Sequence, residues 1–278
     1  MSTDRPPRSG PAPRLALTDV TVRFGGMVAL DSVSLAVGEH EVVGLIGPTG
    51  AGKTTLFNVV CGLVTPRSGE VRLGGGRRRV ATHGLAAAGV ARTLQGLGLF
   101  AGLTARQNVM AGLSTRAPGV FRSSLGTPGS DRHARHARAR ADEVLRTLDI
   151  LDAADRLPDS LPYPVRKRIA LARALVSEPT LLLLDEPAGG LGSEDIAALV
   201  TLVRELAATR DCSILLVEHH VDFVMGVCDR VAVLDFGRLI ADGSPEEVRR
   251  TPAVVEAYLG VDAPAHRTST ATAPERSS

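Results

Sequence analysis

A glycine-rich segment has the residue types and spacing of a phosphate-binding loop. It reads GPTGAGKTT and matches the pattern GxxxxGK[ST] between an expected strand and an expected helix. Glycines let successive backbone N–H groups turn toward phosphate oxygens, and the helix start adds the positive end of its dipole. Lys53 would neutralise the β- and γ-phosphates, and Thr54 would offer its hydroxyl to Mg²⁺. The predicted nucleotide-binding residues are Gly47, Pro48, Thr49, Gly50, Ala51, Gly52, Lys53, Thr54 and Thr55.

A second segment supplies acidic groups that suit the same chemistry. Four leucines are followed by Asp185, Glu186 and Pro187, which places two acids where a buried strand leaves the core. Asp185 would hold Mg²⁺ through water, and Glu186 would polarise a water in line with the γ-phosphate. An acidic strand end alone means little, and a glycine-rich turn can carry a chance lysine. Together the two segments predict Mg²⁺-dependent hydrolysis of a nucleoside triphosphate.

The basic residues are nearly all arginine. Among 32 basic residues, Lys53 and Lys167 are the only lysines. A compact ammonium and a broad planar guanidinium do not fill the same space. The retained lysines therefore indicate positions where an ammonium matters.

Length, composition and charge exclude several classes of protein. The chain has 278 residues, 44% of them hydrophobic, which is enough apolar material for one large α/β unit. Its net charge of +2 and its 3% aromatic residues indicate no direct nucleic-acid partner. No apolar run approaches the ~18 residues that cross a bilayer, and the N-terminus lacks the apolar segment of a secretory signal. We therefore expect a cytoplasmic protein with no transmembrane segment of its own.

Strands and helices alternate along the body of the chain, on either side of a helical stretch. We expect antiparallel edge strands early in the chain, buried strands in its core, and a helical subdomain of about residues 104–176 with a loop at 117–130. Residues 1–13 and 263–278 have the composition of disordered tails. The expected strands are 15–17, 20–22, 33–37, 41–46, 181–185, 213–217 and 231–235, with a hairpin at 68–76; the expected helices are 53–61, 131–151 and 196–209.

Three weaker features each have a simpler interpretation. Arg77–Arg79 could contact nucleic acid but is more typical of a solvated loop. His133 and His136 could share a metal ion, although no third ligand is placed, so a solvent-facing helix surface is favoured. The three cysteines form no CxxC pair, so we expect buried, reduced thiols at Cys61, Cys212 and Cys228.

In combination, the motifs resemble the ATP-binding subunits of ABC transporters over about residues 14–262. Phe24, in VRFGG, matches the aromatic residue that stacks on adenine. Gln95, in ARTLQ, matches the glutamine that senses Mg²⁺ and the γ-phosphate and faces the membrane partner. His219, in LLVEHH, matches the histidine that contacts the γ-phosphate. The resemblance implies a P-loop NTPase (RecA-like) fold, with a parallel-sheet core, an antiparallel β edge and an inserted α-helical subdomain. It assigns catalysis to Glu186, His219 and Gln95, and metal binding to Thr54, Gln95 and Asp185.

Several longer segments resemble the LivG-type subunit in particular, among them RFGGMVALDSVS, GVARTLQ and the closing VVEAYLG. That resemblance implies an ATPase that powers import of branched-chain amino acids or related small polar solutes, such as amides and urea. It also implies a heterodimer with a second, similar ATPase, docked on two membrane permeases at the inner face of the membrane and served by an external binding protein. The solute itself never touches such a subunit, so the sequence does not name it.

The signature segment departs from the family pattern, which is LSGGQ in general and often LxYGQ in this group. Here residues 161–165 read LPYPV. Pro162 has neither a hydroxyl nor an N–H, and Pro164 removes the N–H that the glycine would supply to the partner's γ-phosphate. Val165 replaces the glutamine. The positive charges at residues 166–168 could compensate in part.

Two milder departures are Gly192, where an acid or amide is usual after Leu191, and Thr49 in place of a common asparagine. These changes could be neutral drift. We expect instead a weakened composite ATP site and low activity of an isolated homodimer. An alternative function is an ATP-binding module with little intrinsic hydrolysis, the regulatory half of an asymmetric ATPase heterodimer. A soluble ABC protein acting on ribosomes or DNA is disfavoured, because such chains usually carry two cassettes.

Overall fold

The structure, a computed structural model, describes residues 12–74, 77–78, 81–93, 96–115 and 130–259. Of the expected tails at residues 1–13 and 263–278, residues 1–11 and 263–278 lie outside these ranges, as do Gln95 and nearly all of the expected loop at 117–130.

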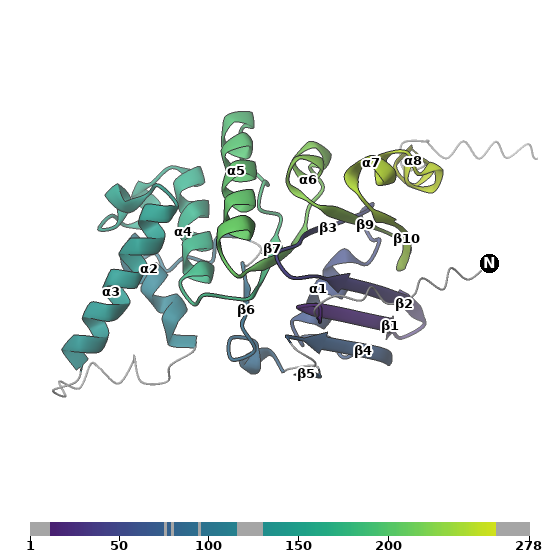
Figure 1. Ribbon diagram of the computed structural model, residues 1–278, viewed down its shortest axis with the longest axis horizontal. Helices are drawn as coiled ribbons and strands as arrows, with labels where there is room; N and C mark the ends of the chain where they lie inside the picture. The colour runs from purple at the N-terminus through teal and green to yellow at the C-terminus, as the bar shows by residue number, and fades with distance from the viewer. Residues whose placement is uncertain (1–11, 75–76, 79–80, 94–95, 116–129, 260–278) are drawn as a thin grey trace, which may run out of the picture.

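A six-stranded sheet forms the centre of the fold (Figure 1), in the order β10-β9-β3-β8-β7-β6. Five strands run parallel and β10 pairs antiparallel to β9 at one edge. The central strands are almost continuous apolar runs, as expected for a parallel sheet covered on both faces. Their bounds are β3 Val42–Ile46, β6 Val90–Arg92, β7 Leu181–Asp185, β8 Ser213–Val217, β9 Arg230–Asp235 and β10 Arg238–Gly243.

An antiparallel sheet, in the order β2-β1-β4-β5, lies beside the first one. It confirms the predicted antiparallel edge and the hairpin near residue 70. Helix α1 (Lys53–Val60) contributes Leu56, Phe57 and Val59 to a core shared with the inner side chains of both sheets. The strand bounds are β1 Leu15–Phe24, β2 Met27–Val37, β4 Ser68–Leu73 and β5 Arg77–Arg78.

Three helices gather at one end of the molecule (Figure 1): α2 Ala105–Ala111, α3 Ser130–Thr147 and α4 Tyr163–Leu175. They pack against one another and occupy the stretch predicted to be helical. The prediction that α3 continues to residue 151 is wrong. Asp149 adopts a left-handed backbone conformation (φ 54°), which ends the helix before a separate turn at Leu151–Ala153. Other single 3₁₀ turns lie at Thr82–Gly84, Gly112–Thr115 and Pro158–Ser160.

Four helices cover one face of the central sheet (Figure 1): α5 Ser193–Thr209, α6 Val221–Val227, α7 Pro245–Arg249 and α8 Pro252–Leu259. Helix α5 begins three residues earlier than expected, because Gly192 caps it and the acidic residues Glu194 and Asp195 suit the positive end of its dipole.

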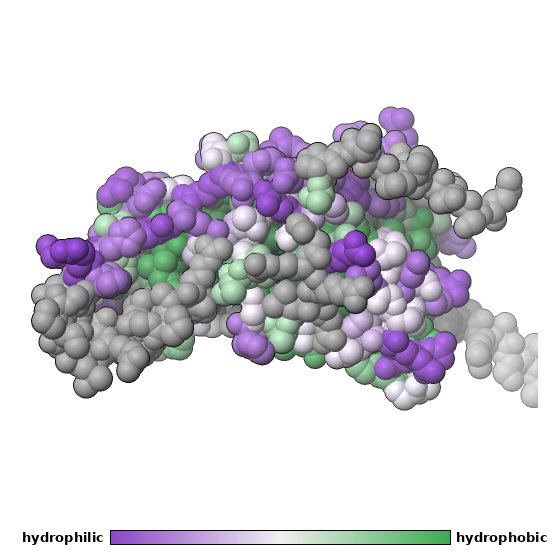
Figure 2. All heavy atoms as spheres, turned by 60° about the horizontal axis from the view of Figure 1, so that its bottom comes forward, coloured by the Kyte–Doolittle hydropathy of each residue, from purple (hydrophilic) through white to green (hydrophobic). Residues whose placement is uncertain are grey.

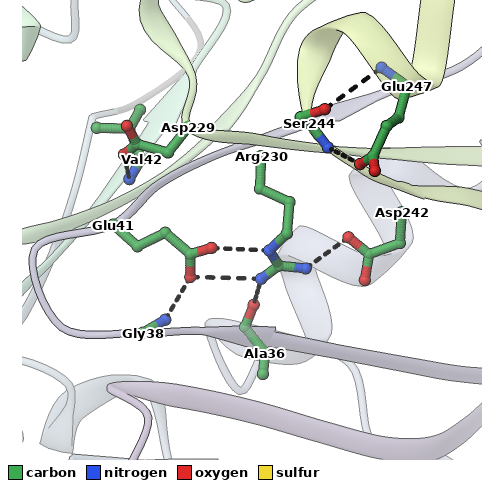
Figure 3. A network of polar contacts seen from close by, with 9 residues as sticks. All are labelled: Ala36, Gly38, Glu41, Val42, Asp229, Arg230, Asp242, Ser244 and Glu247. Atoms are coloured by element: carbon green, nitrogen blue, oxygen red, sulfur yellow. Dashed lines mark hydrogen bonds and ion pairs between the residues drawn. The ribbon is translucent and has the colours of Figure 1, made fainter. Parts of the chain in front are cut away.

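A polar network ties the two sheets together (Figure 3). Arg230, at the start of β9, donates to Glu41 Oε1 at 2.7 Å and to Asp242 Oδ1 at 2.5 Å, and it also bonds the carbonyl of Ala36 on β2. Glu41 in turn accepts the N–H of Gly38 at 2.6 Å. One half-buried arginine thus fixes the approach of the chain to β3, the strand that leads into the phosphate-binding loop.

The surface mixes hydrophilic residues with smaller apolar patches (Figure 2). No helix within the described ranges has the length and apolar character needed to cross a bilayer. His133 and His136 are exposed on α3, which agrees with the solvent-facing interpretation. The three cysteines are buried and unpaired, as predicted.

Candidate nucleotide-binding site

The phosphate-binding loop joins β3 to α1, as the sequence predicts. Gly47 has a φ of 149°, and a Cβ there would lie 2.0 Å from the carbonyl oxygen of Leu234. At Gly52 (φ 106°) a Cβ would lie 2.6 Å from the carbonyl oxygen of Ala29. Neither position can hold a larger residue without moving the backbone. The loop is therefore curled. Other segments pack tightly against its outer side, and its own backbone lines the inner side.

Lys53 is the first residue of α1, and its ammonium lies against the first two residues of this loop. Its Nζ donates to the carbonyls of Gly47 at 2.6 Å and Pro48 at 2.8 Å. Burial lowers the pKa of Lys53, and the negative charge of Glu186 opposes that shift. No side chain caps α1 and its first turn has no acidic residue, so the first N–H groups of the helix are left for an anion. These features fit the phosphates of a nucleotide.

Asp185 ends β7, and its carboxylate is paired with an arginine that sequence reasoning missed. Arg92 Nη2 lies 2.8 Å from Asp185 Oδ2, and the two side chains are only 17% and 10% exposed. Arg92 also lies over the Phe57 ring and donates to Asn58 Oδ1 at 3.3 Å. The pair ties β6 and β7 to α1 beside the expected Mg²⁺ position. A buried arginine needs a carboxylate, which is the only signal that could have revealed the pair.

The structure brings Glu186 and His219 together. His219 Nδ1 lies 3.5 Å from Glu186 Oε1, and both side chains remain partly exposed. Glu186 follows β7 and His219 follows β8, so neighbouring parallel strands deliver both groups to the same edge of the sheet. An acid that could orient water and an imidazole that could contact a phosphate thus lie side by side, and the charge of Glu186 acts on Lys53 of the phosphate-binding loop.

Buried Glu218 holds the two groups in this arrangement. It is fully buried, and its carboxylate accepts the N–H groups of Ala188 at 2.6 Å, His219 at 2.8 Å and His220 at 3.1 Å. One carboxylate therefore joins the turn after Glu186 to the segment that carries His219. The sequence gives little indication of this role, because Glu218 is simply an acid that follows an apolar strand.

The remaining predicted residues lie in different parts of the site. Thr54 is exposed on the first turn of α1, and Phe24 ends β1 with a ring that is 48% exposed. Gln95 lies outside the described residues, although Thr93 just before it accepts the N–H of Asp185 at 3.2 Å. The individual roles of these residues remain predictions.

The signature segment forms the start of α4. Pro162 is its N-cap residue, Pro164 lies in its first turn, and no side chain caps it. The basic residues at 166–168 were expected to compensate for the missing phosphate donors, but most of these side chains contact groups elsewhere in the chain. Lys167 Nζ binds the carbonyls of Glu186 and Pro187, and Arg168 Nη1 points to the carbonyl of Leu148 at 3.4 Å.

Known proteins resemble this chain over most of its length. The family model described as "ABC transporter" matches residues 30–189, and the model "Branched-chain amino acid ATP-binding cassette transporter" matches residues 238–264. The high-affinity branched-chain amino acid transport ATP-binding protein LivG of Salmonella typhimurium is 39% identical, covering 89% of this chain and 98% of that protein. The corresponding protein BraF of Pseudomonas aeruginosa is 37% identical with the same coverage.

Solved structures match over similar lengths. A nucleotide-free ATP-binding cassette of an ABC transporter has a TM-score of 0.76 and 26% identity, covering 89% of this chain and 99% of its own. An ADP-bound cassette has a TM-score of 0.77 and 27% identity, covering 90% and 99%. The fold, the phosphate-binding loop and these relatives agree: the chain belongs to the ATP-binding cassette family of ABC transporter ATPase subunits, in its branched-chain amino acid group.

Proposed function

We propose that this chain binds and hydrolyses ATP to power an ABC importer for branched-chain amino acids or related small polar solutes. One observation carries the proposal. A complete phosphate-binding loop, whose Lys53 feels the charge of Glu186 beside His219, occurs in a chain that matches LivG proteins along nearly its whole length. The alternative of a module with little hydrolysis receives no support from these relatives.

In this mechanism the loop N–H groups and Lys53 bind the phosphates of ATP. Thr54, Asp185 and Gln95 would hold Mg²⁺, which supplies positive charge at the β- and γ-phosphates when bound. Phe24 stacks on the adenine. Glu186 accepts a hydrogen bond from the attacking water and orients it in line with the γ-phosphate, while His219 donates to a γ-phosphate oxygen.

The partners follow from the same assignment. The chain pairs with a second ABC ATPase and docks on two permease subunits, on the cytoplasmic side of the membrane. The two prolines at the start of α4 support a heterodimer, because a partner with an intact signature segment would supply the phosphate donors that this chain lacks.

Uptake by the reconstituted transporter tests the proposal. Proteoliposomes would contain this chain with two permeases and the second ATPase of the transporter, with ATP in the compartment that faces the ATPases and the external binding protein in the other compartment. We expect ATP-dependent uptake of leucine, isoleucine or valine, lost in Lys53→Ala and kept in His136→Ala, which changes an exposed residue of α3. Uptake of amides or urea alone would shift the solute class. Lack of ATP-dependent uptake of every one of these solutes would overturn the proposal.

A further inference from the structure

Lys167 is the second lysine of the chain, and it contacts the residue proposed to orient the attacking water. From the second turn of α4, its Nζ donates to the carbonyl of Glu186 at 3.0 Å and to that of Pro187 at 2.8 Å. Burial lowers the pKa of Lys167, against the charges of Glu218 and Glu186, which favour the ammonium. A half-buried ammonium between two carbonyls is not a solvated surface charge.

The turn that Lys167 contacts is strained. Glu186 has a left-handed backbone conformation with φ 49°, which residues other than glycine adopt rarely. Such a conformation persists when its surroundings enforce it. Here the N–H of Glu186 donates to Val217 O at 2.9 Å, and Glu218 accepts the N–H of Ala188. Lys167 is the contribution of α4 to this set of contacts.

A second contact joins α4 to the same turn. At Gly190, whose φ of 74° favours glycine, a Cβ would lie 3.0 Å from the ring of Tyr163, the first residue of α4, so a larger residue would press on that ring. The ammonium of Lys167 lies 5.7 Å from the centre of that ring. The first two turns of α4 therefore rest on residues 186–190.

The two lysines of the chain make the same kind of contact. Lys53 binds the carbonyls of Gly47 and Pro48, and Lys167 binds those of Glu186 and Pro187. In each case one small cation with three donors reaches two carbonyls of a sharp turn, a task that a planar guanidinium fits poorly. This explains why these positions are lysine in a chain whose other basic residues are arginine.

We propose that Lys167 is a positioning residue for ATP hydrolysis, which holds the carbonyls of Glu186 and Pro187 and thereby directs the Glu186 carboxylate. It also links Glu186 of this chain's own site to the start of α4, which faces the ATP of the partner in a head-to-tail dimer. The inference rests on the proposed function, because it assigns Lys167 to act through Glu186.

Turnover by the assembled transporter tests the inference. Lys167→Met keeps the apolar stem and removes the ammonium, so kcat should fall by about tenfold or more, while the KM for ATP stays within about twofold. Lys167→Arg should recover part of the loss. Arg168→Met is the matched control, since it also removes a cation of α4 that bonds a carbonyl, which here is that of Leu148 and not that of Glu186 or Pro187. Its kcat should stay within about twofold of the wild type.

A double-mutant cycle separates positioning from general damage. If Lys167 acts through Glu186, adding Lys167→Met to Glu186→Gln should lower kcat no further. The same tenfold loss in both backgrounds would overturn the inference, as would unchanged kcat in Lys167→Met or an equal loss in Arg168→Met. Should Lys167→Met fail to fold, as judged by thermal unfolding, Lys167→Gln would replace it in the cycle with the same expected pattern. Wild-type turnover in Glu186→Gln would refute the proposed function itself, whereas a normal Glu186→Gln loss without the Lys167 effect would refute only this inference.

Discussion

Two helices of this molecule begin where a phosphate group is expected, and they begin differently. Helix α1 follows a loop of glycines, has no side-chain cap and starts with Lys53, whose ammonium faces the loop. Helix α4 starts between Pro162 and Pro164, and its nearby cations mostly contact carbonyls within the chain. The first helix is equipped to bind an anion, whereas the second has lost N–H donors at the same kind of position.

This difference weakens phosphate binding at α4 but leaves the fold intact. Proline is tolerated in the first turn of a helix because the N–H it lacks has no helical partner there. Helix α4 consequently forms, and Ile169, Ala172 and Leu175 on it are buried in the core. What disappears is the N–H at the N-cap Pro162 and at Pro164 in the first turn, two of the donors that a helix start can offer to an anion. We therefore expect this chain to bind its own nucleotide through α1 and to contribute little to a partner's site through α4.

The largest effect should follow the loss of the acid beside the α1 site. Glu186→Gln keeps the shape of the side chain but removes its charge, so turnover of the assembled transporter should fall by about 10²-fold or more while MgATP binding persists. Steady-state phosphate release and calorimetry would measure the two. Glu143→Gln, an equivalent change at an exposed position of α3, should alter neither. Unchanged turnover in Glu186→Gln would mean that this site is not the productive one.

The next effect concerns binding at the start of α1. Lys53→Ala removes a charge-assisted phosphate contact and should weaken MgATP binding by about 1.5–3 kcal/mol in calorimetry of the isolated chain. Lys167→Met should leave this affinity nearly unchanged, because its ammonium binds the turn after Glu186 and not the phosphate loop. Equal affinity of Lys53→Ala and the wild type would show that α1 does not bind the nucleotide.

Restoring the usual signature residues at the start of α4 should make this helix, like α1, able to donate to a phosphate. In a head-to-tail homodimer both sites would combine a good α1 with a poor α4, and loss of one γ-phosphate donor typically costs about 10²–10³ in rate. Pro162→Ser, Pro164→Gly and Val165→Gln together should raise the ATPase rate of the isolated chain, at saturating protein, by at least about tenfold. A triple variant that folds and binds ATP but gains nothing would contradict the comparison, as would a fully active wild-type homodimer.

The sequence predicted the α1 site better than its surroundings. The glycine pattern specifies the loop, and strand order alone brings Glu186 and His219 to one edge of the sheet. Arg92 could not be placed, because β6 is a three-residue strand with no readable alternation, and its partner Asp185 lies 93 positions away in the chain. The contacts of Lys167 were hidden for the same reason, since they depend on how α4 packs on the turn after β7.

The charges beside α4 show a further limit of sequence reasoning. Proximity in the sequence suggested that the basic residues at 166–168 would replace the lost phosphate donors. In the structure, helical geometry sends neighbouring side chains in different directions, so Lys167 and Arg168 bind carbonyls on different elements. A count of charges near a motif therefore says little about the direction of the charged groups.

The smallest expected effect isolates one missing donor. Pro164→Ala restores a single N–H in the first turn of α4 without the freedom of glycine. One hydrogen bond contributes about 0.5–1.5 kcal/mol, so the ATPase rate of the isolated chain should rise by about 2–10-fold. The free energy of unfolding should fall by about 0.4–1 kcal/mol, because proline restricts the unfolded chain. Pro245→Ala is the matched control: it removes a proline from the first turn of α7, a helix that packs on β9 and β10. It should show the same loss of stability in denaturant titration and no gain in rate. A gain in rate in both variants would trace the effect to general loosening of the chain, and no gain in Pro164→Ala would show that the missing N–H is not what separates α4 from α1.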